Sequence, residues 1–142
     1  MHYGTTDTEI NTLKRAKKPL PKTEIVSYGR YTKWDRERRE LPELVDLTTE
    51  VKAEIGVEFG MIIEIFQAKG RFLDFVIDHP PFKDQNGNVE PQFEGSYQIR
   101  NNPYAFFLGD TIWEPVEDKR GPWILSVFMD GKELASKTIL LT

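Results

Sequence analysis

His79 is the residue of this chain whose chemistry most readily suggests a functional site. It ends a run of β-forming residues, precedes Pro80 and Pro81, and opens a long segment rich in proline, glycine and asparagine. An imidazole at that place could be a polar group at a binding cleft or a pH-sensitive group. It could also close the end of a strand through a backbone hydrogen bond, and this structural role is the one that we favour.

The residue types give little support for catalysis. A hydrolytic triad needs a nucleophile, an imidazole base and an orienting acid, and of the two histidines only His79 is a candidate, because His2 lies near the N-terminus. Asp78 would point to the opposite face of a strand from His79. The sequence has no Gly-x-Ser-x-Gly turn and no glycine-rich phosphate loop. We therefore expect no enzymatic activity and no cofactor. A small enzyme that uses His79 with an acid is the least favoured alternative.

Aromatic residues provide a second set of candidates, because exposed rings bind sugars, peptides or bases by stacking. Trp123 shares a face with Leu125 and Val127 and is expected in the core. Other aromatic rings lie at the edges of β-rich runs or in the long segment that follows His79. The candidate residues for binding a ligand or partner are His79, Phe82, Phe93, Tyr97, Trp34 and Trp113.

The segment from Pro80 to Pro103 is far longer than most connections in a compact domain. Such loops are usually functional, disordered or hiding an element of secondary structure. Phe93, Tyr97 and Ile99 could form one irregular edge strand within it. We expect any binding site to involve this segment, with His79 at its base. The alternative is a flap that protects the edge of a sheet.

Composition narrows the classes of protein further. The chain has 142 residues, of which 39% are hydrophobic and 30% charged, as in a globular domain of ordinary size. There are no cysteines, which excludes disulfides and argues against a structural zinc site; we expect no metal. The net charge of −4 argues against a nucleic-acid partner. No apolar run approaches the roughly 20 residues of a membrane-spanning helix.

Residues 1–22 differ in amino-acid composition from the rest of the chain. Leu13 to Lys22 contains several lysines and an arginine but no acid, and Pro19 and Pro21 exclude a regular helix there. We expect a disordered basic tail, either a solvated linker or an arm that contacts an acidic partner. Met1 to Ile10 lacks the apolar stretch of a secretory signal, so we expect a cytoplasmic protein.

From residue 23 to residue 142 short β-rich runs alternate with turn residues, and no segment has a sustained helical period. The alternation of apolar and polar residues is clearest from Leu47 to Ile55. Asp130-Gly131 predicts a type I′ hairpin turn that pairs Val127 with Leu134, with a bulge in the last strand. This pattern favours an all-β fold, an immunoglobulin-like antiparallel two-sheet sandwich of about seven strands. The predicted strands are 24–31, 47–55, 59–67, 71–79, 104–112, 122–130 and 133–141.

Several short motifs follow one another over about residues 23–142. They are Tyr28-Gly29-Arg30-Tyr31, Gly56-Val57-Glu58-Phe59-Gly60, His79-Pro80-Pro81, Trp113-Glu114, Gly121-Pro122-Trp123-Ile124-Leu125-Ser126-Val127 and Asp130-Gly131-Lys132-Glu133-Leu134-Ala135. Their order resembles a bacterial family of domains of unknown function. The resemblance implies a small bacterial protein without an assigned activity.

The leading hypothesis for function is therefore a non-catalytic binding or interaction module for an unidentified protein or small ligand. Sandwich folds commonly present loops at their ends as binding surfaces. The alternative is a carbohydrate-binding module, which would need Trp34, Trp113 or Tyr31 exposed and coplanar.

Overall fold

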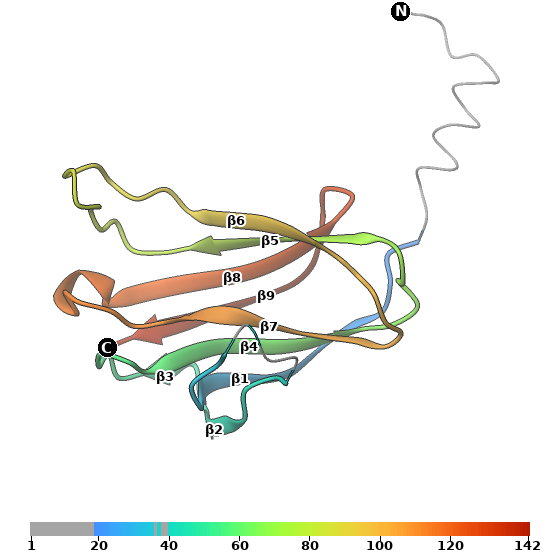
Figure 1. The fold of residues 1–142 in the computed structure, drawn as a ribbon, viewed down its shortest axis with the longest axis horizontal. Coiled ribbons are helices and arrows are strands. Elements are labelled where there is room, and N and C mark those ends of the chain that lie inside the picture. The colour runs from blue at the N-terminus through green and yellow to red at the C-terminus, as the bar shows by residue number, and fades with distance from the viewer. Residues whose placement is uncertain (1–18, 36, 38–39) are drawn as a thin grey trace, which may run out of the picture.

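The computed structural model describes residues 19–35, 37 and 40–142, which form two β-sheets packed face to face (Figure 1). The four-stranded sheet has the order β2-β1-β4-β7 and the five-stranded sheet the order β3-β9-β8-β5-β6. All pairings are antiparallel except that of β3 with β9. The strands are β1 (Thr23–Tyr31), β2 (Leu44–Leu47), β3 (Glu50–Val51), β4 (Glu58–Ile65), β5 (Phe72–Asp78), β6 (Phe93–Gln98), β7 (Tyr104–Thr111), β8 (Gly121–Met129) and β9 (Lys132–Leu141).

Helical structure is minimal, as the sequence predicts. Within the described residues the only helix is the single 3₁₀ turn η1 (Glu117–Lys119), between β7 and β8. No helix in that part of the chain is long and apolar enough to span a membrane. Residues 1–18, most of the predicted basic tail, lie outside the described residues. Pro19, where the description begins, accepts a hydrogen bond on its carbonyl from Arg71 Nη1 at 3.1 Å.

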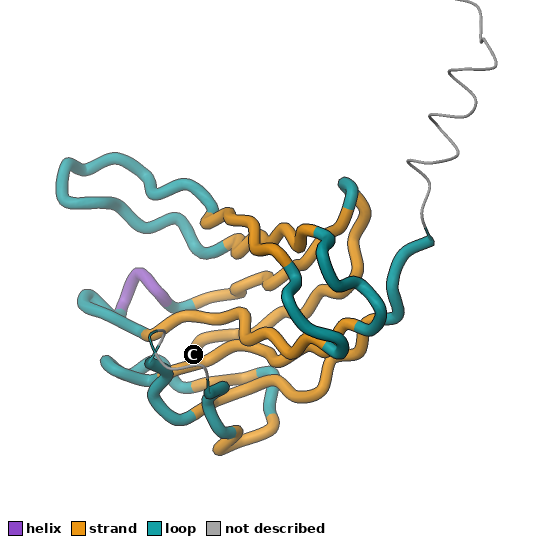
Figure 2. Tube along the Cα trace, turned by 45° about the vertical axis from the view of Figure 1, so that its right-hand side comes forward, coloured by secondary structure: helices purple, strands orange, loops and turns teal. Residues whose placement is uncertain are grey.

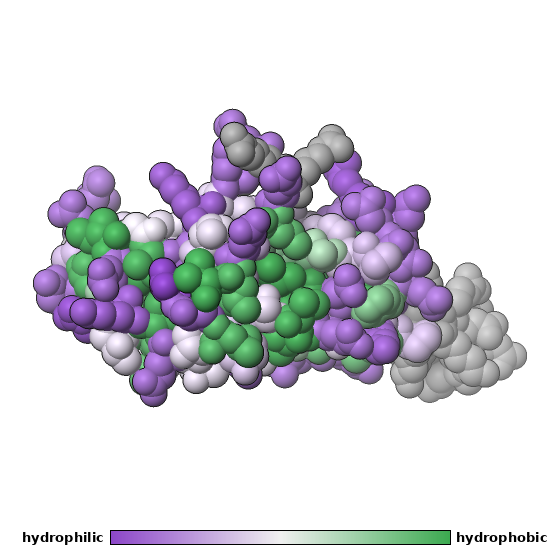
Figure 3. All heavy atoms as spheres, turned by 90° about the horizontal axis from the view of Figure 1, so that it is seen from below, coloured by the Kyte–Doolittle hydropathy of each residue, from purple (hydrophilic) through white to green (hydrophobic). Residues whose placement is uncertain are grey.

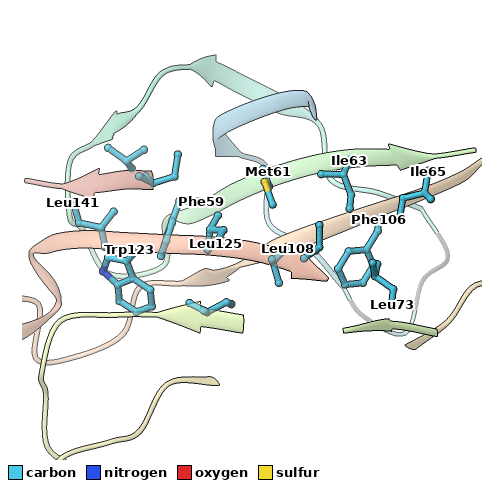
Figure 4. Close-up of a cluster of buried hydrophobic side chains, with 14 of the residues drawn as sticks. Phe59, Met61, Ile63, Ile65, Leu73, Phe106, Leu108, Trp123, Leu125 and Leu141 are labelled. Atoms are coloured by element: carbon cyan, nitrogen blue, oxygen red, sulfur yellow. The ribbon is translucent and has the colours of Figure 1, made fainter. Parts of the chain in front are cut away.

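The core lies between the sheets and follows from period-two alternation in β4 and β8 (Figure 4). In β4 every second side chain from Phe59 to Ile65 is fully buried, and in β8 the same holds from Trp123 to Met129. Trp123, Leu125 and Val127 lie in this core, as the sequence predicts, together with Val51 and Ile63. Phe75 is only partly buried and packs against the border of the core.

The predicted strand at 47–55 is wrong. β2 ends at Leu47, and β3 contains only Glu50–Val51. Between them Thr48 Oγ1 accepts a hydrogen bond from the amide of Glu50 and donates one to its carbonyl, both at 3.0 Å. This local turn redirects the chain from one sheet to the other. The alternation survives only in part, since Val51 is buried while Leu47 and Ile55 are more than 60% exposed.

The strand suggested within the segment from Pro80 to Pro103 is confirmed as β6. It pairs with β5 over the whole of its length, from Ile77 opposite Phe93 to Phe72 opposite Gln98. This strand and the division of 47–55 bring the total among the described residues to nine strands rather than about seven. The connection that remains after β5 is residues 79–92.

The C-terminal hairpin has the predicted turn but not the predicted pairing. Asp130 and Gly131 have φ values of 51° and 76°, as a type I′ turn requires. Val127 lies opposite Ala135 rather than Leu134, because the register shifts after Val127 and leaves Leu134 as the extra residue of a bulge. The bulge that the sequence suggested is therefore in the first half of β9.

We expect Trp123→Ala to lower the free energy of unfolding by about 3–5 kcal/mol, because it empties a fully enclosed space between the sheets. Urea unfolding followed by circular dichroism measures this change. Phe72→Ala is the matched control, since Phe72 is 58% exposed and its removal should cost about 0.5 kcal/mol or less. A loss below about 1 kcal/mol for Trp123→Ala would contradict its position in the core.

Candidate functional site

Residues 79–92 form a self-paired hairpin, here called the arm, that extends past the end of the sandwich (Figures 1 and 2). Lys83 and Val89 form an isolated antiparallel bridge, and the amide of Glu90 donates to Phe82 O at 2.8 Å. Asp84 Oδ1 closes the tip by accepting hydrogen bonds from the amides of Asn86 and Asn88, at 2.8 and 3.0 Å. The arm therefore has a defined shape that hydrogen bonds within it maintain.

Phe82 anchors the base of the arm in the end of the sandwich. Its side chain is 3% exposed, although the residues on either side of it are exposed. Its ring stacks on His79 at 4.2 Å between centroids and on Trp123 at 6.0 Å, and meets Trp113 edge-on at 5.3 Å. The arm is thus joined to the core by apolar contact as well as through its two ends.

At the base of the arm, His79 links the segment in which the arm begins to the segment in which it ends. Its Nδ1 lies 2.8 Å from Pro80 O and its Nε2 lies 2.8 Å from Pro91 O. A neutral imidazole has one N–H, so both ring nitrogens donate together only in the imidazolium form. The contact with Pro80 O agrees with the strand-end role favoured from the sequence. The ring also packs against Phe93 at 4.6 Å.

Lys119, which sequence reasoning missed, is buried beneath this group of rings and is only 2% exposed. Its Nζ donates to Asp118 Oδ1 at 2.6 Å and to Pro115 O at 3.1 Å. The same atom lies 4.7 Å from the ring centroid of Phe82 and 4.6 Å from that of Trp113. Burying a cation is expensive unless it is paired. Here a carboxylate, a carbonyl and two ring faces compensate for the lost water.

The backbone carbonyl of Lys119 also helps to hold η1 in place. Trp123 Nε1 donates a hydrogen bond to Lys119 O at 2.8 Å, which fixes η1 against the end of the sandwich. The local sequence Asp118-Lys119-Arg120-Gly121 has the composition of a solvated loop. The one available signal was its position between two tryptophans, Trp113 and Trp123.

Four of the six predicted site residues therefore lie in one group: His79, Phe82, Phe93 and Trp113 are linked through ring contacts. We call these four, with Trp123 and Lys119, the anchor cluster. Phe82, Trp123 and Lys119 are buried, His79 and Phe93 are half-buried, and Trp113, at 36% exposure, is the most open member. Its geometry holds the arm in place, and it leaves the tip of the arm as the exposed part.

Tyr97 and Trp34 lie elsewhere. Tyr97 is farther along β6, where it stacks on Phe75 at 5.7 Å and contacts Phe106 at 5.3 Å. Trp34 packs edge-on against Phe107 of the four-stranded sheet at 5.0 Å, and its Nε1 donates to Glu40 O at 3.1 Å. These two residues are not part of the anchor cluster.

The aromatic platform expected of a carbohydrate-binding module is not formed by Tyr31, Trp34 and Trp113. Tyr31 is 3% exposed, and burial raises the pKa of its hydroxyl despite a hydrogen bond with Ser27. Trp34 and Trp113 pack against different rings, Phe107 and Phe82, which belong to different sheets or their loops. The three side chains therefore do not present one flat row to solvent.

Two other surface features include no residue of the arm. Apolar side chains gather on the side of the molecule where β1 and β2 lie (Figure 3), and the exposed apolar residues of these strands are Ile25, Val26, Leu44, Val45 and Leu47. A shallow hollow of about 560 Å³ is lined by Ile55 and by Glu114, Pro115, Val116 and Glu117. Within the described ranges no group of three or more His, Cys, Asp or Glu side chains is placed to hold a metal ion.

We expect Lys119→Met to lower the free energy of unfolding by about 1–3 kcal/mol, because the carboxylate of Asp118 and the carbonyl of Pro115 lose their buried donor while the volume is kept. Chemical unfolding gives the stability, and acrylamide quenching of tryptophan fluorescence should increase as Trp113 loosens. Lys132→Met, at an exposed lysine, should change stability by about 0.5 kcal/mol or less. Equal effects of the two substitutions would contradict the role of the buried ammonium.

A solved structure shows the same fold. An immunoglobulin-like protein from Pseudomonas aeruginosa matches with a TM-score of 0.66 and 23% sequence identity, over 84% of this chain and 96% of that chain. The predicted immunoglobulin-like sandwich is therefore confirmed. No curated protein matches the sequence closely enough to be counted as a relative.

The family resemblance suggested by the motifs is also confirmed. The model of the family called domain of unknown function DUF3859 matches residues 20–139, which include the whole anchor cluster and all the described strands except the last two residues of β9. With that match over most of its length, the chain belongs to the DUF3859 family.

Proposed function

We propose that this domain is a non-catalytic binding module that recognises a protein partner through the tip of the arm. One observation carries the proposal: the arm is anchored by buried groups at its base, while every residue from Lys83 to Val89 is exposed. Val89 at this tip is an apolar side chain that is 60% exposed. A rigid base below an exposed tip is the usual arrangement of a recognition loop on a sandwich scaffold.

Preorganisation gives this arrangement a physical advantage in binding. A flexible loop must be ordered when it binds, and fixing its backbone costs roughly 1–2 kcal/mol for each residue. In the arm the backbone is already fixed by the Asp84 hydrogen bonds and by the Lys83–Val89 bridge. Less of the binding energy would be lost in ordering the tip.

The surroundings of His79 support a role without catalysis. Both of its ring nitrogens lie 2.8 Å from backbone carbonyl oxygens. A general base needs a free nitrogen within reach of a substrate proton. These contacts favour a structural role for the ring, which links the carbonyl groups of Pro80 and Pro91.

Site-specific photo-crosslinking in cells that express the protein natively tests the proposal. A photoreactive amino acid replaces Asn86 at the tip, and in a matched control it replaces Lys52, which is exposed but distant from the arm in sequence. We expect a protein adduct that depends on light at Asn86 and is absent at Lys52. The same adduct from both positions would contradict recognition by the tip.

A second variant separates binding from folding. Gln85→Ala combined with Val89→Asp changes the exposed surface of the tip and leaves Asp84 and Phe82 in place. We expect the Asn86 adduct to be lost while the melting temperature stays within about 2 °C of that of the parent protein. Retention of the adduct in this variant would exclude the tip as the recognition surface.

A further inference from the structure

β6 is an unprotected edge strand. It forms the outer border of the five-stranded sheet in both views (Figures 1 and 2). Its six residues, Phe93–Gln98, include neither lysine nor proline, and its register with β5 has no bulge. Natural edge strands usually carry such devices or are very short, because a free row of amide and carbonyl groups pairs readily with another chain.

The other edges differ from β6. β2 has four residues, with an irregular register against β1, and β3 has two. β7 is longer, but Phe106, Phe107 and Leu108 at its centre are buried. In β6 four of six residues are exposed. β6 is therefore the described edge that a second strand could approach along most of its length.

The inner face of β6 adds incompletely covered aromatic surface beside this edge. Phe93, Gly95 and Tyr97 lie on the face that points toward the other sheet, since they pair with Ile77, Phe75 and Leu73. Tyr97 is 46% exposed although its ring stacks on Phe75 and contacts Phe106. An added strand would cover part of this surface.

We propose that β6 pairs antiparallel with β6 of a second copy of this chain, around a two-fold axis at Gly95, so that the two five-stranded sheets become continuous. Side chains that lie opposite each other must belong to the same face. Centring the pair on Gly95 satisfies this condition and places Phe93 opposite Tyr97 twice on the inner face. On the outer face it places Glu94 opposite Ser96 twice.

The strand is self-complementary in this register. Aromatic pairs across strands are favourable, and like charges directly opposite each other are unfavourable; here Glu94 meets a serine rather than a second carboxylate. The absence of a side chain at Gly95 also matters, because the ring of Phe75 occupies that place: a Cβ on Gly95 would lie 2.4 Å from Phe75 Cε2. The alternative axis at Ser96 would lose both Phe93–Tyr97 pairs.

A contact this small predicts weak association. Interfaces below about 1,200 Å² of total buried area are typical of transient complexes. We therefore expect a reversible monomer–dimer equilibrium, measured by sedimentation velocity from roughly 5 to 500 µM, a range chosen to span weak affinities. A protein that remains monomeric at the upper concentration would overturn the proposal.

Charge substitutions at Ser96 test the register. Ser96→Glu places a carboxylate opposite Glu94 twice, and two such pairs should weaken the dimer about tenfold. Ser96→Lys places an ammonium there and should leave the dimer as strong or stronger. Thr138→Glu, at an exposed residue of β9 on the same outer face, should leave the equilibrium unchanged. Equal weakening by Ser96→Glu and Ser96→Lys would overturn this register.

Cysteine crosslinking gives an independent test, because the natural chain has no cysteine. With Glu94→Cys and Ser96→Cys together, each new thiol faces one on the second copy, and mild oxidation should produce a covalent dimer. Asp74→Cys, on the same face of β5 one strand inward, should not crosslink. Ser96→Cys alone should not crosslink either, and a covalent dimer from it would indicate the axis at Ser96 and overturn the axis at Gly95.

This inference depends on the edge of β6 and not on the tip of the arm. The adduct expected from Asn86 should persist in the Ser96→Glu variant, so failure of one proposal is distinguishable from failure of the other. Loss of that adduct in Ser96→Glu would mean that the two surfaces are not separate and would overturn this part of the proposal.

Discussion

The indole N–H of Trp123 is the group on which the structure of the arm-bearing end of this domain depends. The side chain has no exposed surface, so its N–H must find an acceptor inside the protein. The acceptor is Lys119 O, and this bond holds η1 against the end of the sandwich. With η1 in place, the ammonium of Lys119 lies against Phe82 and Trp113. Phe82 in turn fixes the arm, so one buried hydrogen bond leads to the shape of an exposed hairpin.

The sequence predicted the fold wherever alternation coincided with burial. β4 and β8 were recognisable because every second residue is apolar and faces the core. Leu47 to Ile55 shows equally regular alternation, yet the hydroxyl of Thr48 bonds to the backbone of Glu50 and interrupts the strand. A side chain that competes for backbone hydrogen bonds leaves no trace in a hydrophobic pattern. Such breaks are invisible to arguments from periodicity.

Sequence analysis identified the aromatic residues of the candidate site but not its buried lysine. His79, Phe82, Phe93 and Trp113 were singled out by type and position, and they do lie together. Lys119 was not, because lysine is among the residues least often buried, and only its neighbours in space make burial tolerable. Tyr97 and Trp34 looked equivalent to the other aromatics in the sequence. They separate from them only in the folded chain, where Tyr97 lies near the end of the edge strand β6 and Trp34, outside any strand, packs against Phe107 of the other sheet.

The hydrogen bonds within the arm determine which of its residues can be replaced without changing its shape. The turn at the tip depends on Asp84 and its backbone contacts, while Phe82 and His79 secure the base. Gln85 and Val89 between these fixed points make no contact that the sandwich requires, since both project into solvent. Other amino acids at these two positions should therefore leave the fold intact. The residues that fix the shape of the arm are thus distinct from those exposed at its tip, which makes the tip a natural position for grafting foreign peptides.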